Sequence, residues 1–256
     1  MALTLDLNCD MGESYGAWRM GNDEAVLPYV SSANIACGFH GGDPGTLRAT
    51  VAAALAHGVA LGAHPSLPDL VGFGRRVMQI SPAEAYDIVV YQIGALAGVA
   101  ASQGARLHHV KAHGALYNMA ARDPALAHAL CRAVRDVDSS LVLYGLAGSE
   151  MLRAAAEIGL TACSEVFCDR SYQDDGSLTP RGRPGAMIED PDAAQAQVLR
   201  MVREGMVRAQ SGKDVPVRAD TLCIHGDQPD AVDFARRIRR ALAESGIELR
   251  PPAPAG

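Results

Sequence analysis

The 256-residue sequence lacks several features that would define a protein class at once. It has no run of about 18 apolar residues, so it predicts no membrane span. The N-terminus has no charged stretch followed by an apolar core, so we expect no signal peptide. The formal net charge of −6 leaves no basic excess, which argues against a nucleic-acid-binding protein.

Local motifs for common cofactors and metal sites are also missing. The six cysteines form no C-x-x-C pair, so we expect neither structural zinc nor a disulfide framework, and predict a reduced, cytoplasmic setting. The dinucleotide motif G-x-G-x-x-G and the P-loop G-x-x-x-x-G-K-[ST] are absent. No H-x-H or H-E-x-x-H occurs either, so we predict no metal.

What the sequence does contain is a steady alternation of strand-like and helix-like segments. It is 48% hydrophobic and 20% charged, a balance that supports a large core and argues against disorder or a coiled coil. The strand-like runs lie near 3–10, 32–39, 59–64, 107–112, 141–146, 161–167 and 220–225. Seven strands separated by helices predict parallel β-α units, closed as a barrel or open as a doubly wound sheet. No linker divides them, so we expect a single domain over 1–256 with a flexible tail at about 250–256.

Several helices have clear start signals. Ser81, Pro82 and Glu84 form a predicted capping box. Asp190 followed by Pro191 opens another helix, which we expect to continue to Gly212. Asp123–Pro124 and Gln228–Pro229 begin two more in the same way.

Sorting each strand by side-chain face brings the polar residues to one side. In the first strand Leu5, Leu7 and Cys9 alternate with polar residues, and apolar faces should meet the helices. The polar side then points into the barrel, where active sites form at the carboxyl ends of parallel strands. The polar residues that gather there, and that we predict as catalytic, are Asp10, Glu13, His40, His64, Lys111, His113, Glu165 and His225. Asp6 lies deeper on the same strand and is interpreted as structural.

These residue types allow several roles. Asp10 and Glu13 could act as general bases, as metal ligands or as partners of Lys111. The histidines could move protons near neutral pH, and Lys111 could hold a carboxylate, a phosphate or an oxyanion. Two glycine-rich loops, 38–45 and 72–78, and the long polar loop 169–186 suggest anion binding and a lid. The residues that we predict to bind substrate or phosphate are Asn8, Asn34, Arg75, Asp169, Arg170, Arg181 and Asp227.

Six stretches of the chain resemble the LamB/YcsF family, which includes a component of bacterial 5-oxoprolinase. They are "DLNCDMGES", "SSANIACGFHGGDP", "GAHPSLPDLVGFGRR", "VKAHGALYN", "SEVFCDRSYQDDGSLTPRGRPGA" and "CIHGDQPDA". The family pattern has proline, an aromatic residue and alanine where this chain has Ala112, Leu67 and Cys168. None of these departures replaces a polar residue of the predicted site.

The resemblance implies a fold, a reaction and partners. The implied fold is a single-domain, seven-stranded β/α barrel, a distorted TIM-like barrel similar to that of polysaccharide deacetylases. The implied reaction is ATP-dependent opening of 5-oxo-L-proline to L-glutamate, with Mg²⁺ accompanying ATP and two partner subunits, B and C. Whether this chain or a partner binds ATP stays open, as does its oligomeric state, a homo-oligomer being one option. Two alternatives also stay open: a metal-dependent amide or sugar deacetylase with Asp10 and two histidines as ligands, and a non-catalytic substrate-binding subunit.

Overall fold

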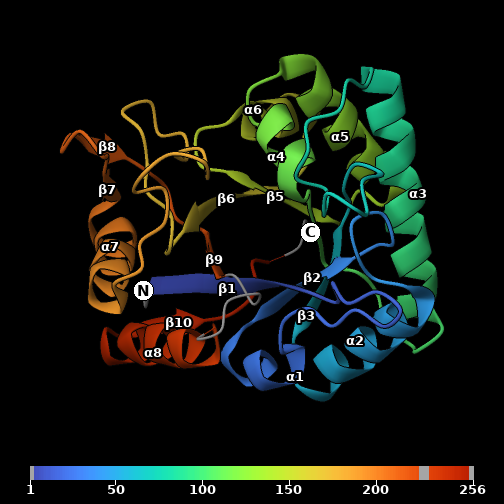
Figure 1. The fold of residues 1–256 in the computed structure, drawn as a ribbon, viewed down its shortest axis with the longest axis horizontal. Helices are drawn as coiled ribbons and strands as arrows, with labels where there is room; N and C mark the ends of the chain where they lie inside the picture. The colour runs from blue at the N-terminus through green and yellow to red at the C-terminus, as the bar shows by residue number, and fades with distance from the viewer. Residues whose placement is uncertain (1–2, 225–230, 254–256) are drawn as a thin grey trace.

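A closed ring of seven parallel strands forms the centre of the molecule, and helices cover its outside (Figure 1). The computed structural model describes residues 3–224 and 231–253. Around the ring the strands follow the order β1-β2-β3-β4-β5-β6-β9, and β9 pairs with β1 to close it. The ring strands are β1 (Leu3–Met11), β2 (Ser32–Ala36), β3 (Ala60–His64), β4 (His109–Lys111), β5 (Val142–Leu146), β6 (Ala162–Phe167) and β9 (Thr221–Ile224). The closed barrel is confirmed, and the open sheet is excluded.

The helices between the strands follow the predicted start signals. Ser81 forms the capping box with Glu84, and Asp123 and Asp190 accept hydrogen bonds from the first turns of their helices. The helices are α1 (Asp23–Val26), the short 3-10 helix η1 (Leu27–Tyr29), α2 (Pro44–Ala56), α3 (Pro82–Ala101), α4 (Gly114–Ala120), α5 (Pro124–Val137), α6 (Glu150–Ile158), α7 (Pro191–Glu204) and α8 (Ala231–Glu244). The predicted start of α8 at Gln228–Pro229 lies outside the described residues. No helix in the described part of the chain is long and apolar enough to cross a membrane.

Two predicted boundaries are wrong. The helix expected to reach Gly212 ends at Glu204, because Gly205 adopts a left-handed conformation with φ 64° and stops it. The chain then forms an antiparallel hairpin, β7 (Met206–Arg208) with β8 (Asp214–Pro216). The strand expected over 32–39 ends at Ala36, before Gly38 turns the backbone at φ 98°.

One further parallel strand lies outside the ring. β10 (Ile247–Leu249) pairs with the first residues of β1, where Leu3 opposes Ile247. The predicted tail is described only as far as Ala253, and the His108 Nε2–H group donates to the Pro252 carbonyl oxygen at 2.8 Å.

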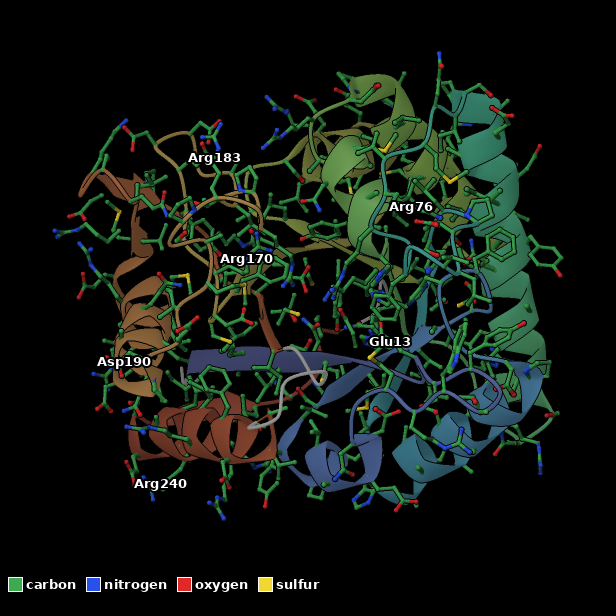
Figure 2. The ribbon with its side chains drawn as sticks, in the orientation of Figure 1. Glu13, Arg76, Arg170, Arg183, Asp190 and Arg240 are labelled. Carbon is green, nitrogen blue, oxygen red and sulfur yellow. The ribbon has the colours of Figure 1, made fainter. Side chains whose placement is uncertain are left out.

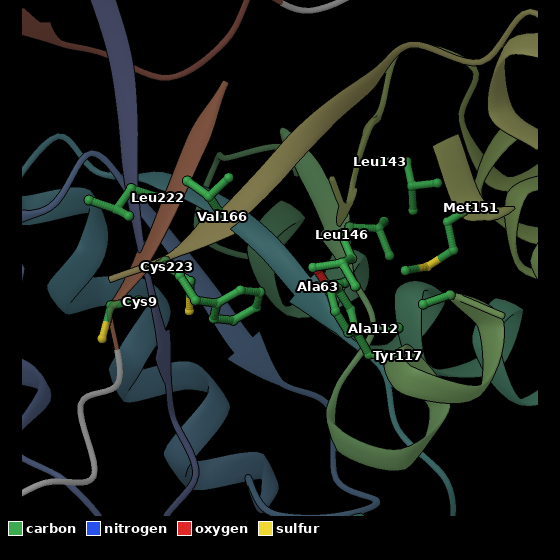
Figure 3. Packing of buried hydrophobic residues seen from close by; sticks show 14 of the residues in the cluster. Cys9, Ala63, Ala112, Tyr117, Leu143, Leu146, Met151, Val166, Leu222 and Cys223 are labelled. Carbon is green, nitrogen blue, oxygen red and sulfur yellow. The ribbon is translucent and has the colours of Figure 1, made fainter. Parts of the chain in front are cut away.

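The predicted division of strand faces is correct. Leu5, Leu7 and Cys9 are buried in the hydrophobic core between the barrel and its helices. Figure 3 shows this packing for residues of neighbouring strands, such as Val166 and Leu222. The polar residues of the same strands fill the lumen, where Asp6 accepts hydrogen bonds from Ser31, Ser32 and Thr221. Burial of the apolar side of β1 therefore turns its polar side inward.

Candidate functional site

Lys111 lies at the centre of the carboxyl end of the barrel. Its ammonium group donates to Asp10 Oδ1 at 2.9 Å and to Asn8 Oδ1 at 3.1 Å, and lies 2.9 Å from Glu165 Oε1. Cys223 Sγ accepts a fourth contact at 3.0 Å. Burial alone would lower the pKa of Lys111, but Asp10, Cys223 and Glu165 together raise that pKa well above its ordinary value. Lys111 is therefore a buried cation held between two carboxylates.

The buried side-chain amide groups of two asparagines hold Asp10 and Lys111 in position. Asn34 Nδ2 donates to Asp10 Oδ1 at 2.8 Å and to Asn8 Oδ1 at 2.7 Å. Asn8 Nδ2 donates to Glu165 Oε1 at 3.1 Å. The side chains of both asparagines are thus used inside the lumen, so the structure places these predicted binding residues where they orient Asp10 and Lys111.

A cluster of three histidines and one carboxylate lies beside Asp10. Glu13 Oε1 is 3.1 Å from His40 Nε2 and 3.6 Å from His113 Nδ1, and His64 Nε2 is 3.3 Å from Asp10 Oδ2. Burial lowers the pKa of His40 and of His113 well below the usual range, and the neighbouring histidines lower both further. Donor atoms of Glu13, His40, His64 and His113 lie within 4.8 Å of one another, so these residues could hold a metal ion. We call these four the histidine cluster.

A cavity of about 580 Å³ opens above Lys111. Asp10, His64, Lys111 and His113 line its polar floor. Its walls carry the positive charges of Arg75, Arg122, Arg170 and Arg181. A larger hollow of about 690 Å³ elsewhere is lined mostly by small apolar residues, and its Arg218 and Asp220 are paired with each other. The cavity above Lys111 therefore combines titratable groups with anion-binding groups.

The loop after β6 supplies two of those arginines, Arg170 and Arg181. Arg170 is buried, and burial together with Arg181 lowers its pKa to about 10. Arg170 Nη2 donates to the Thr179 carbonyl oxygen at 2.5 Å, which ties the start of the loop to its middle. In the view of Figure 2, Glu13 and Arg170 lie toward the middle of the molecule, whereas Arg183 lies nearer its edge.

Most of the remaining predicted site residues do not line the cavity. Asp169 is buried beside Arg170 but does not line the cavity. Glu13, His40 and Glu165 lie below the cavity and are not among its lining residues. His225 and Asp227 lie outside the described residues. Of the two adjacent arginines, Arg75 lines the cavity while Arg76 bonds to Asp69.

The structure adds three residues that the sequence analysis did not single out. Tyr117 donates its hydroxyl to Glu165 Oε2 at 2.7 Å, and Thr221 accepts from Asn8 Nδ2 at 2.7 Å. Phe73 accepts from His113 Nε2 at 2.9 Å through its backbone carbonyl oxygen. The sequence analysis could have identified Tyr117, because it lies in "VKAHGALYN", six residues after Lys111. A carbonyl group carries no sequence signal, so the contribution of Phe73 could not be predicted.

Comparison with known proteins gives consistent matches over nearly the whole chain. The LamB/YcsF family profile matches residues 5–255. The A subunit of 5-oxoprolinase from Bordetella parapertussis is 76% identical over 246 residues, which cover 96% of this chain and 98% of that protein. The protein of the same name from Bacillus subtilis is 58% identical over 245 residues, covering 96% and 95%. The crystal structure of a lactam utilization protein from Thermus thermophilus superposes with a TM-score of 0.92 at 52% identity, covering 97% of this chain and 99% of that one.

Proposed function

The chain belongs to the LamB/YcsF family, and from this premise we propose that it is the 5-oxoprolinase subunit that binds 5-oxo-L-proline and opens its lactam to give L-glutamate. The observation that carries the proposal is the cavity above Lys111. A carboxylate, a buried ammonium and several arginines lie around one space. The substrate is a small cyclic amide with a carboxylate, and this cavity offers a group for each part of it.

The arginines are suited to the substrate carboxylate. Guanidinium groups form charge-assisted, often bidentate hydrogen bonds with carboxylates. Arg75 and Arg181 are both exposed and both line the cavity. Substrate held there by its carboxylate would place its lactam carbonyl over Lys111 and Asp10.

The carbonyl must be activated before water can attack it. A five-membered lactam is a poor electrophile, so we propose that ATP, with Mg²⁺, transfers its terminal phosphoryl group to the lactam oxygen. Water then adds to the carbon, and the C–N bond breaks as the nitrogen takes a proton. The resulting γ-glutamyl phosphate is hydrolysed to L-glutamate and phosphate. Lys111 stabilises the negative charge on the oxygen and phosphoryl group during these steps.

Asp10 is the residue best placed to activate the attacking water. Its Oδ1 is held by Asn34 and Lys111, and its carboxylate lines the cavity floor. Glu13 could serve the same role in principle, but it lies below the cavity. We therefore propose Asp10 as the general base, with Asn8, Asn34 and Glu165 as positioning residues.

The test compares two aspartates of the same strand in the complex reconstituted with subunits B and C. Asp10→Asn should lower ATP-dependent glutamate release by about 10²–10⁴-fold, because the base is lost. Asp6→Asn is the control, since Asp6 contacts only hydroxyl groups deeper in the lumen in the interactions described. It should retain most of the activity.

The remaining outcomes identify the alternatives. Full activity of Asp10→Asn together with tight 5-oxoproline binding would indicate a substrate-binding role, with the chemistry carried out on a partner. Amide or sugar deacetylation by the chain alone, without ATP and abolished by a chelator, would indicate a metal-dependent deacetylase. Either result would overturn the proposed role.

A further inference from the structure

Contacts with backbone carbonyl oxygens determine which ring nitrogen of His64 and of His113 carries a hydrogen. His64 Nδ1 lies 2.7 Å from the Lys111 carbonyl oxygen, and His113 Nε2 lies 2.9 Å from the Phe73 carbonyl oxygen. A carbonyl oxygen only accepts, so both of these ring nitrogens must carry a hydrogen. A neutral imidazole has a single N–H group, so the other nitrogen of each ring is left with a lone pair.

Those two lone pairs face each other. His64 Nε2 and His113 Nδ1 are 2.9 Å apart, and both rings are almost completely buried. At this distance two lone pairs repel, unless a proton or a metal ion lies between them. The Glu13 carboxylate borders the same space, with Oε1 at 3.6 Å from His113 Nδ1. The backbone carbonyl groups have therefore fixed the ring tautomers so that nitrogen and oxygen lone pairs meet.

The spacing of these atoms fits a first-row divalent metal ion. Ligands at about 2.0–2.1 Å around a tetrahedral Zn²⁺ lie about 3.3 Å from one another. The separations in the cluster are 2.9 Å for His64–His113, 3.1 Å for His40–Glu13 and 3.6 Å for His113–Glu13, on either side of that value. Three imidazoles and one carboxylate also match the donor preference of Zn²⁺ and its neighbours.

We propose that Glu13, His64 and His113, joined by His40, bind one divalent transition-metal ion, with Zn²⁺ the best fit. This inference does not depend on the proposed reaction. It replaces the sequence-based prediction of no metal, which considered only ligand pairs close together in the chain. Here the ligands come from the ends of β1, β2, β3 and β4, and only the closed barrel brings them together.

One ring must move when the ion binds. The His40 and His113 rings are stacked 3.7 Å apart at an angle of 3°, so their lone pairs are parallel rather than convergent. His40 Nδ1 is buried and has no hydrogen-bond partner in the described part of the chain, so no such bond opposes a tilt of this ring. His64 and His113 are instead held by their carbonyl partners, as metal-binding histidines commonly are through the ring nitrogen that does not bind the ion.

The loop that holds His113 is built closely around it. Phe73 has a φ of 54°, the only positive value for a non-glycine residue in the described ranges 3–224 and 231–253. This conformation carries the carbonyl group that fixes His113. A Cβ atom at Gly74 would lie 2.9 Å from His113 Cδ2, so glycine is needed for the loop to come this close. The glycine-rich segment 72–78 thus supports the ring position that the proposed ion requires.

The test titrates the chelator-treated full chain with Co²⁺ and with Zn²⁺. We expect about one ion per chain, visible d–d absorption for Co²⁺ and a higher melting temperature with Zn²⁺. His64→Gln and His113→Gln should each weaken binding by more than about 10-fold, since loss of a group that merely orients a ligand already costs that much. His57→Gln, at the exposed end of α2, is the matched control and should bind as the wild type does.

Circular dichroism of the metal-free variants shows whether each still folds, and Glu13→Gln gives a second measurement should a histidine variant fail. The absence of stoichiometric binding to the wild type would overturn the proposal. Equal binding by the folded cluster variants and His57→Gln would overturn it as well. Because the titration involves no turnover, it stays informative whether or not the chain opens 5-oxoproline.

Discussion

Three acidic residues of the first strand and its following turn have three different environments. Asp6 is surrounded by hydroxyl groups, and burial raises the pKa of its carboxyl group. Asp10 contacts Lys111 and lines the cavity, whereas Glu13 contacts His40 and lies beneath it. Chain position relative to the strand end therefore separates a structural acid, a proposed base and a proposed metal ligand.

Removal of the buried ammonium should affect stability as well as activity. Lys111→Met leaves Asp10 and Glu165 without their buried cation, so we expect a loss of about 3–5 kcal/mol in the free energy of unfolding. Lys213→Met is the matched control, because Lys213 is the only other lysine and is exposed. Urea denaturation of both variants measures the difference. Equal stabilities would show that the lysine does not compensate the two carboxylates.

At the scale of elements, the segment between β6 and α7 forms part of the cavity wall. It begins at the end of a barrel strand and supplies two cavity arginines. Its first part is anchored by Tyr172, whose hydroxyl group accepts from the Phe167 N–H group at 2.8 Å. The segment is thus ordered against the barrel while it places two arginines in the cavity wall.

Two arginines of this segment provide a paired prediction. Arg181→Ala should raise KM for 5-oxoproline by about 10–100-fold with little change in kcat, because a charge-assisted hydrogen bond to bound substrate is lost. Arg183→Ala removes an exposed arginine that is not part of the cavity lining, and it should leave both constants unchanged. Steady-state kinetics of the reconstituted complex measures both. A kcat effect without a KM effect would place Arg181 in the chemistry rather than in binding.

At the scale of the whole molecule, closure of the barrel links residues far apart in the sequence. β1 pairs with both β2 and β9, so the ring has no open edge among its seven strands. The lumen is also filled by contacts that cross it, such as the hydrogen bond between the hydroxyl groups of Ser32 on β2 and Tyr144 on β5, which are 3.2 Å apart. We propose that residues 1–256 form one domain and unfold in one cooperative transition.

That transition should depend on pH through the buried histidines. Burial lowers the pKa of His109 well below its usual value, so below about pH 6.5 the unfolded chain binds this proton more readily than the folded chain. The free energy of unfolding should therefore fall as the pH drops, by up to about 1.4 kcal/mol per pH unit for each such histidine. Thermal unfolding between pH 7 and pH 5 measures this slope. His109→Gln should make it shallower and His57→Gln should not, and identical slopes for all three proteins would contradict the explanation.

Local sequence patterns were sufficient for most of the barrel. Strand alternation correctly divided Leu7 from Asn8 and predicted all seven ring strands, because burying one face of a strand is a local requirement. Capping residues such as Ser81 located helix starts for the same reason. The hairpin after Gly205 and the short strand β10 were missed, since three-residue strands form only when a partner is already in place.

The polar residues of the candidate site could be identified from the sequence, because they recur at the ends of successive strands. The residues that each of them contacts could not be identified in this way. That Lys111 bonds Asp10, and that His64 Nε2 and His113 Nδ1 face each other at 2.9 Å, were decided by the tertiary structure. These contacts join segments between about 50 and 100 residues apart. The sequence by itself determined which face of each strand is buried, because that depends on neighbours along the chain. Only closure of the barrel determined which polar groups meet, because their distances depend on strands that lie far apart in the sequence.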